Sequence, residues 1–386
     1  MLEAHAEKDA QMKIGVDIRE LEARTTTGIG RYLHNLITYG IGNSGHTFYL
    51  YGNQHTVTTL QAENIRVRLA NEGVTLWWDQ VTLASLARAD GLDLFFSPYF
   101  KGPGRVECPL VTTIHDLLFM LFPDYSSWHR RPRNAVLKLM ARWVSERASL
   151  VLTVSEHAKG DIQTLLGVDA AKIEVLPNSV DETYIPVTDG RTLKEVQERY
   201  GIEPPYVYYL GNFKPHKNVQ SLLRAFASLP PEVRTRYELV LGTKPDPWLG
   251  ECRRLAQALG IASRTRFIGQ IDEADMPALY SGAELFVFPS LYEGFGLPPL
   301  EAMACGTAVV VSDRTSLPEV VGDAGCLVDP SDGVAMPAAM ARILQNPDER
   351  RDMEARGLAR AKGFRTADIC KRQMQLLEQV AQRGSS

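Results

Sequence analysis

The sequence has little cysteine, and its cysteines are not arranged to hold a fold or a metal ion. They are odd in number, form no CxxC pair and lie far apart, at Cys108, Cys252, Cys305, Cys326 and Cys370. This pattern indicates neither a disulfide framework nor a zinc site. No apolar run reaches membrane-spanning length, and residues 1–11 are too polar for a signal peptide. A net charge of −4 lacks the basic excess that general nucleic-acid binding requires. These absences favour a cytoplasmic protein.

The composition that remains is that of an ordinary globular chain. The 386 residues are 45% hydrophobic and 23% charged, and this length suggests two or three domains. Short apolar runs alternate with helical patterns in the first half of the chain and again from Tyr206 onward. This alternation is typical of parallel α/β sheets. Residues 1–11 are predicted to be a disordered leader.

The most informative stretch is Pro289–Glu301. It follows the buried-strand pattern at 285–288 and precedes a small-residue helix that Gly306 would end. Gly294 and Gly296 would leave main-chain N–H groups bare at the helix start, where the positive end of the helix dipole attracts phosphate. Carboxylates at positions 293 and 301 could accept hydrogen bonds from sugar hydroxyls. The stretch therefore predicts a holder for a sugar joined to a diphosphate, although both carboxylates could also be merely solvated.

The segment E-G-F-G-L-P-P-L-E, with Glu293 and Glu301 at its ends, resembles the signature of retaining nucleotide-sugar glycosyltransferases of family 4. That resemblance implies an α/β fold of the GT-B type, in which two Rossmann-like domains face each other across a cleft and the C-terminal helix crosses back to the N-terminal domain. The expected N-terminal acceptor domain spans 12–183, the donor domain 184–365 and the returning helix 366–386. A linker is expected at about 182–205, with a helix at 192–200 inside it.

Two features of the first half are assigned through this resemblance. Gly28 and Gly30 form a G-x-G loop before a helix, which alone could be a tight turn without a ligand; in the family such a loop faces the diphosphate and the acceptor. His115 ends a strand, and ligands of open α/β sheets bind beyond strand carboxyl ends. A single histidine is often structural, but the following Asp116 makes this position similar to the family's donor-sugar histidine. No G-x-S-x-G elbow supports a hydrolase triad.

The turn at 211–218 is similar to the family's diphosphate clamp, with one departure. Lys217 stands at the usual lysine position, but Asn212 replaces an arginine that is common there. Lys214 and Arg31 are both candidates to supply the missing charge. An alternative reading of Lys217 is a surface lysine in a polar turn.

The resemblance implies a metal-independent transfer of a hexose to a hydroxyl, with retention of anomeric configuration. No D-x-D motif suits a metal-bridged diphosphate, so neither a metal nor another cofactor is expected. The expected catalytic residues are His115, Lys217 and Glu293. The expected donor-binding residues are Gly28, Gly30, Asn212, Phe295, Gly296, Leu297 and Glu301. The alternatives are a UDP-sugar donor, a soluble acceptor, or an inactive nucleotide-sugar-binding partner.

The opening T-T-T-G-I-G-R-Y and the G-N-x-x-P-H-K-N turn resemble bacterial mannosyltransferases of polysaccharide and O-antigen assembly. This implies GDP-mannose as donor and a polyprenyl-linked oligosaccharide as acceptor, at the inner face of the cytoplasmic membrane. The segment 128–147 carries six basic residues beside an apolar stripe of Val136, Leu139, Met140, Trp143 and Val144. This pattern predicts either a helix that packs on the core with a solvated basic face or a helix that binds the surface of an anionic membrane.

Overall fold

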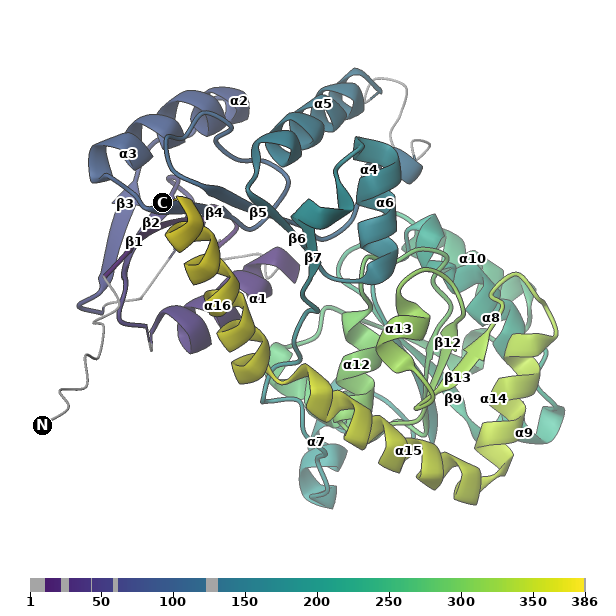
Figure 1. The fold of residues 1–386 in the computed structure, drawn as a ribbon. Helices are drawn as coiled ribbons and strands as arrows, with labels where there is room; N and C mark the ends of the chain where they lie inside the picture. Colours follow the sequence, from purple (N-terminus) through teal and green to yellow (C-terminus); the bar gives the residue numbers. More distant parts are fainter. Residues whose placement is uncertain (1–10, 22–27, 43, 58–61, 123–130, 385–386) are drawn as a thin grey trace, which may run out of the picture. The chain divides into compact units, whose positions relative to one another are not determined.

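The structure, a computed structural model, describes residues 11–21, 28–42, 44–57, 62–122 and 131–384, so the expected leader lies outside it except for Gln11. The chain forms two compact units. The first comprises the residues up to Val154 together with Ala158–Pro177 and Thr366–Ser386, and the second comprises Ser155–His157 and Asn178–Arg365. Each unit is built on one parallel sheet (Figure 1).

The first unit contains a seven-stranded sheet in the order β3-β2-β1-β4-β5-β6-β7, with every neighbouring pair parallel. Its strands are β1 (Lys13–Asp17), β2 (Thr47–Gly52), β3 (Ile65–Leu69), β4 (Leu94–Ser97), β5 (Leu110–Ile114), β6 (Leu150–Thr153) and β7 (Ile173–Val175). The central strands β4 and β5 are buried along their whole length, as expected for a sheet covered on both faces.

Helices cover both faces of this sheet, because successive strand residues point to opposite sides. Phe96 and Leu152 lie in one apolar core with α1 (Gly28–Asn35), the π-helical η1 (Leu36–Ile41) and α16 (Thr366–Gly384). Their neighbours Phe95 and Val151 lie in a second core with the π-helical η2 (Trp78–Thr82), α3 (Leu83–Asp90), α5 (Arg131–Arg147) and α6 (Glu156–Leu166). The remaining short helices are α2 (Thr75–Trp77), α4 (Leu118–Leu121) and the 3-10 turn η5 (Ala170–Lys172).

The last helix confirms the expected return of the chain to the first unit. Met374, Leu376, Leu377 and Ala381 of α16 are buried in the same core as Leu36 and Ile37 of η1. Gln373 also donates a hydrogen bond to the Tyr32 hydroxyl at 2.6 Å. Within the described residues, no helix is both long and apolar enough to cross a bilayer.

The second unit contains a six-stranded parallel sheet in the order β10-β9-β8-β11-β12-β13. Its strands are β8 (Tyr206–Leu210), β9 (Glu238–Gly242), β10 (Thr265–Gly269), β11 (Leu285–Phe288), β12 (Val309–Ser312) and β13 (Cys326–Val328). Its helices are α7 (Gly190–Tyr200), α8 (Val219–Ala227), α9 (Pro231–Arg236), α10 (Leu249–Ala258), α11 (Met276–Ser281), α12 (Leu297–Ala304), α13 (Leu317–Val321), α14 (Ala335–Gln345) and α15 (Pro347–Ala361). Four 3-10 turns complete it: η6 (Pro215–Lys217), η7 (Ala262–Arg264), η8 (Glu273–Asp275) and η9 (Lys362–Phe364).

The strand order predicts where a ligand would bind in the second unit. The chain starts in the middle of the sheet at β8, adds strands on one side, and then crosses to the other side with β11. In sheets of this kind ligands bind at the switch point, beyond the carboxyl ends of the two central strands. Here those ends lead into the loops at 211–218 and 289–296, which are the two stretches that the sequence singled out.

Candidate active site

Lys217 and Glu293 come together at this switch point, although 76 positions separate them in the chain. The Lys217 Nζ atom lies 2.6 Å from Glu293 Oε1, and the two side chains are 14% and 13% exposed. Ser290 donates its hydroxyl to the same carboxylate oxygen at 2.6 Å, and the ammonium lies 5.3 Å from the centre of the Phe288 ring. The site thus holds a shielded cation whose present counterion is a carboxylate on a neighbouring loop.

Main-chain hydrogen bonds hold the two loops beside each other. The His216 carbonyl accepts from the Leu291 N–H at 2.7 Å. Asn218, whose φ of 55° ends the η6 turn, donates its amide to the Pro289 and Pro330 carbonyls. The His216 ring is buried, and burial followed by the charges of Lys217 and Lys214 lowers its pKa to about 3. The His216 imidazole next to Lys217 is therefore neutral and does not compete with the lysine for an anion.

The turn from Phe295 to Leu297 presents main-chain N–H groups at the start of α12. Among the described residues, none accepts a hydrogen bond from the N–H of Phe295, Gly296 or Leu297. The next two helical residues are prolines, which have no N–H, so these donors are the ones that the helix start offers. Ser316 fixes the turn by donating its hydroxyl to the Phe295 carbonyl at 2.6 Å. The geometry is suited to holding an anion.

Gly296 is required by the shape of that turn. Its φ of 122° is a conformation that residues with a side chain rarely adopt, and a Cβ atom there would lie 2.7 Å from Leu317 Cδ2. Phe295, one residue earlier, is buried and meets Phe364 edge to face at 5.9 Å. The packing of Phe295 and the backbone conformation of Gly296 together define where the main-chain N–H groups of the turn point.

Glu301 lies deeper than its neighbour Glu293. It is 2% exposed, and its Oε2 atom accepts a hydrogen bond from the Tyr280 hydroxyl at 2.8 Å. Burial, with the nearby Glu301 charge adding to it, raises the Tyr280 pKa well above its ordinary value, so the phenol stays protonated and donates. The sequence predicted a hydroxyl-binding carboxylate at this position, and the structure adds the tyrosine that orients it.

Asn212 does not supply the cation that its position lacks. Its side-chain oxygen accepts from the Lys214 N–H at 3.3 Å, and its carbonyl accepts from the Tyr209 hydroxyl at 2.8 Å. The next N–H, of Phe213, donates to Asp246. Asn212 therefore shapes the turn, and Lys214 is exposed on it.

His115 belongs to the first unit, where it follows β5. Its Nε2 atom lies 3.1 Å from the Pro98 carbonyl oxygen, and its ring meets Tyr32 edge to face at 5.0 Å. Burial lowers the His115 pKa to about 4, so the ring is neutral at physiological pH. Because a carbonyl can only accept, Nε2 carries the hydrogen and Nδ1 is left as an acceptor. Gly28 is the exposed first residue of α1, Gly30 is buried in that helix, and the loop at 22–27 before them lies outside the described residues.

The low pKa of His115 leads to a prediction about pH. A base with a folded-state pKa of about 4 and an ordinary value near 6.5 favours folding above pH 6.5, and this contribution is lost as the pH falls through 4. At its full extent it amounts to about 3 kcal/mol, at 1.36 kcal/mol per pKa unit. Urea unfolding of the wild type and of His115→Gln between pH 4 and 7.5 measures it: the difference between them should shrink as the pH falls. A constant difference across this range would contradict a neutral, partly buried His115.

Three residues of the candidate site were not predicted from the sequence. Ser290 and Ser316 donate to the Glu293 side chain and to the Phe295 carbonyl, and Tyr280 donates to Glu301. The available signals were weak: Ser290 lies three residues before Glu293, and Tyr280 is one of two hydroxyl residues in the short helix α11.

Comparisons with known proteins agree with this geometry. Residues 26–184 match the family described as Glycosyltransferase Family 4, and residues 193–360 match the family described as Glycosyl transferases group 1. The chain is 38% identical over 274 residues to the O-antigen chain mannosyltransferase B of Escherichia coli, covering 70% of each protein. It is 31% identical to the serotype-specific mannosyltransferase WbdA of Escherichia coli, over 68% of this chain and 32% of that protein.

Solved structures show the same fold. The sucrose-phosphate synthase of Thermosynechococcus elongatus aligns with a TM-score of 0.77 and 22% identity, over 97% of this chain and 100% of the other. Anabaena HepE, solved in complex with UDP and glucose, aligns with a TM-score of 0.74 and 18% identity, over 96% of this chain and 100% of the other. The GT-B fold class expected from the sequence is thereby confirmed. The chain belongs to the family 4 (group 1) glycosyltransferases.

Proposed function

We propose that this glycosyltransferase moves mannose from GDP-mannose to a hydroxyl of a lipid-linked oligosaccharide, with retention of configuration and without a metal ion. The observation that carries the proposal is the shielded Lys217 ammonium on one loop of the switch point, with the N–H groups of the Phe295–Leu297 turn on the other. Both Escherichia coli relatives are named as mannosyltransferases, which supports mannose, and the name of the first supports an O-antigen chain as the acceptor.

These residues suit a leaving diphosphate. In the proposed reaction, the bond between the anomeric carbon and the β-phosphate oxygen breaks, and its electron pair leaves with the diphosphate. The acceptor oxygen bonds to the same face of the anomeric carbon, and its proton passes to an oxygen of the leaving phosphate. Lys217 and the turn N–H groups would stabilise the charge that develops, which is the largest contribution in many enzymes.

The remaining site residues are proposed to bind the sugars. Glu293 would exchange its present partner Lys217 for hydroxyls of the transferred hexose while the diphosphate takes over the lysine. Glu301, oriented by Tyr280, would accept from the ribose. His115 would offer Nδ1 to a hexose hydroxyl, because its Nε2 hydrogen is engaged by Pro98.

A donor assay tests the proposal directly. Purified protein is incubated with GDP-mannose, UDP-glucose or UDP-galactose and an oligosaccharide acceptor, in excess EDTA and again with Mg²⁺ or Mn²⁺. We expect α-linked mannosyl product from GDP-mannose at the same rate in both conditions. Turnover that EDTA abolishes and Mg²⁺ or Mn²⁺ restores would reject the metal-free mechanism. Product from a UDP-sugar alone would show that the donor is a UDP-sugar. Binding of a nucleotide-sugar without release of nucleotide or transfer of sugar would favour an inactive nucleotide-sugar-binding partner.

Glu301→Ala tests the ribose contact. Loss of a charged hydrogen bond should weaken GDP binding by about 1–3 kcal/mol, measured by calorimetry. Tyr280→Phe is the matched control: it removes the hydroxyl that orients Glu301 but leaves the carboxylate, so its effect should be smaller. An unchanged affinity in folded Glu301→Ala protein would remove Glu301 from the nucleotide site.

A further inference from the structure

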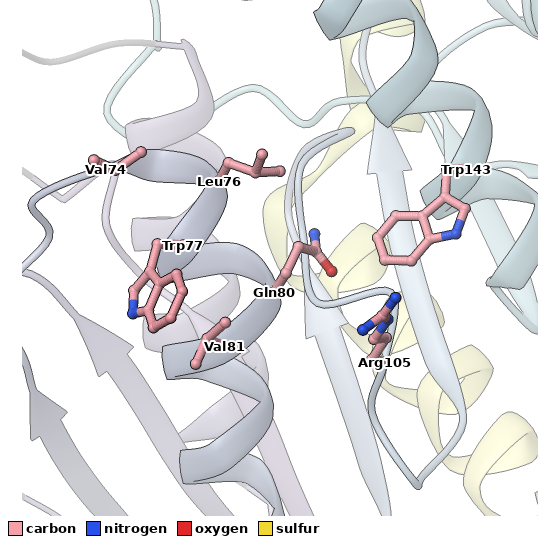
Figure 2. A pocket seen from close by; sticks show the side chains of 7 residues that line it. All are labelled: Val74, Leu76, Trp77, Gln80, Val81, Arg105 and Trp143. Carbon is pink, nitrogen blue, oxygen red and sulfur yellow. The ribbon is translucent and has the colours of Figure 1, made fainter.

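The first unit carries an apolar hollow that the proposed reaction does not use. It has a volume of about 540 Å³, which lies within the range of ligand pockets, and it is open to solvent on one side. Figure 2 shows it between the α2–η2 segment and α5. Its lining residues are Val74, Leu76, Trp77, Gln80, Val81, Arg105 and Trp143.

The Gln80 side chain in this lining is engaged by other parts of the first unit. The Gln80 amide donates to the Gly102 carbonyl at 2.8 Å and accepts from the Gly104 N–H at 3.1 Å. The Trp143 ring packs against Gly104, where an added Cβ would lie 2.4 Å from it. Gln80 and Trp143 are thus held in place by these contacts, and the surface that the hollow offers is almost entirely carbon.

The rim exposes apolar side chains that a soluble surface normally avoids. Trp77 and Val74 are each 66% exposed, and Leu76 is 51% exposed. On α5 the predicted apolar stripe divides: Val144 is buried, but Val136 and Leu139 stay exposed, so the reading of α5 as wholly core-facing is wrong for these two residues. An apolar surface of this kind marks a site of interaction.

Two arginines lie in or beside the lining of the hollow, and the exposed carboxylates nearby in the chain, Glu107 and Glu146, are paired with Arg88 and Arg142. Arg105 belongs to its lining, the Arg147 guanidinium lies 5.0 Å from the Trp143 ring centre, and Lys138 is exposed on α5. The acidic residue of the α2–η2 segment, Asp79, is fully buried and bonded to Arg19. The hollow therefore complements an anionic surface with apolar chains beneath it. A second copy of the same surface would place these cations against one another.

We infer that this hollow, framed by Trp77 and Trp143, docks the enzyme on an anionic lipid bilayer by taking in a lipid acyl chain, with Arg105 at the headgroup level. Tryptophan and arginine are typical of the interface between headgroups and chains. The inference deepens the proposed function, on which it rests for the reason why the enzyme visits a membrane. It assigns the contact with the bilayer to the α2–η2 segment as well as to α5, the basic helix that the sequence analysis considered for this role.

The test is binding of the full chain to vesicles of phosphatidylcholine with and without phosphatidylglycerol, measured by flotation at low salt. Wild type should float with the anionic vesicles, and acyl-brominated lipid should quench its tryptophan fluorescence. The double variant L76E/W77E should bind at least tenfold more weakly, and Arg105→Ala should reduce the preference for anionic vesicles. The matched control is I185E/V334E, two exposed apolar residues of the second unit, which should bind within twofold of wild type.

The outcomes separate this inference from the proposed function. L76E/W77E should retain mannosyl transfer to a soluble oligosaccharide; loss of all transfer in the wild type, with vesicle binding intact, would reject the proposed function alone. Vesicle binding equal in wild type and L76E/W77E, or absent quenching, would overturn the hollow as the docking site. So would a concentration-dependent dimer that L76E/W77E abolishes, because the hollow would then be a contact between copies.

Discussion

Replacing Lys217 with alanine should lower kcat by about 10²–10³-fold, the usual effect of removing one group that stabilises developing negative charge. The ammonium is 14% exposed and lies among Glu293, Ser290 and the Phe288 ring, so its field acts in a partly desolvated site. KM for the donor should change less than kcat, because the charge on the diphosphate grows as the bond to the sugar breaks. Steady-state kinetics with GDP-mannose, the proposed donor, measures both constants.

Lys214→Ala is the matched control for this prediction. Lys214 lies on the same turn, three residues earlier, but is exposed. Lys214→Ala should lower kcat by severalfold at most if Lys217 is the residue that stabilises the charge on the leaving diphosphate. A second variant, Glu293→Gln, frees the Lys217 ammonium from its carboxylate and should tighten GDP binding while transfer falls. Near-normal kcat in Lys217→Ala with a large loss in Lys214→Ala would assign the clamp to Lys214, and near-normal rates in both would direct the search to Arg31.

Gly296→Ala is expected to damage both the stability of the second unit and its nucleotide site. The residue has a φ of 122°, and a methyl group would lie 2.7 Å from Leu317 Cδ2. Backbone strain of this kind costs about 1–3 kcal/mol, which should appear as a lower free energy of unfolding of the second unit. Relief of the strain would also turn the Phe295–Leu297 N–H groups away, so GDP affinity should fall by at least tenfold.

The control is Gly250→Ala near the start of α10, in the same unit. A methyl group there would meet only the Arg254 guanidinium, at 3.9 Å. Alanine in a helix with room for it typically stabilises by about 0.4–1 kcal/mol, so this variant should be neutral or more stable, with normal GDP affinity. If Gly296→Ala behaved like Gly250→Ala in urea unfolding and calorimetry, the turn would not depend on the glycine.

Local sequence was sufficient for most elements of the second unit. The apolar runs at Tyr206–Leu210 and Leu285–Phe288 are strands over those same residues, β8 and β11. A strand that is buried on both faces appears in the sequence as a short run of large apolar residues. It can therefore be predicted without knowing which strands lie beside it. By contrast, β3 at Ile65–Leu69 was missed. It lies at the edge of its sheet, and its two arginines break the apolar run that marks a central strand.

The sequence by itself determined the alternation of strands and helices, the glycine turn before α12 and the family, because each depends on residues close together in the chain. Only the tertiary structure decided which distant residues meet. Lys217 reaches Glu293 because β8 and β11 are neighbours in the sheet, and Trp77 shares a hollow with Trp143 because α2–η2 and α5 lie on one face of the first sheet. Strand order and helix placement follow from burying the apolar surface of a whole unit at once, and no local pattern encodes that balance.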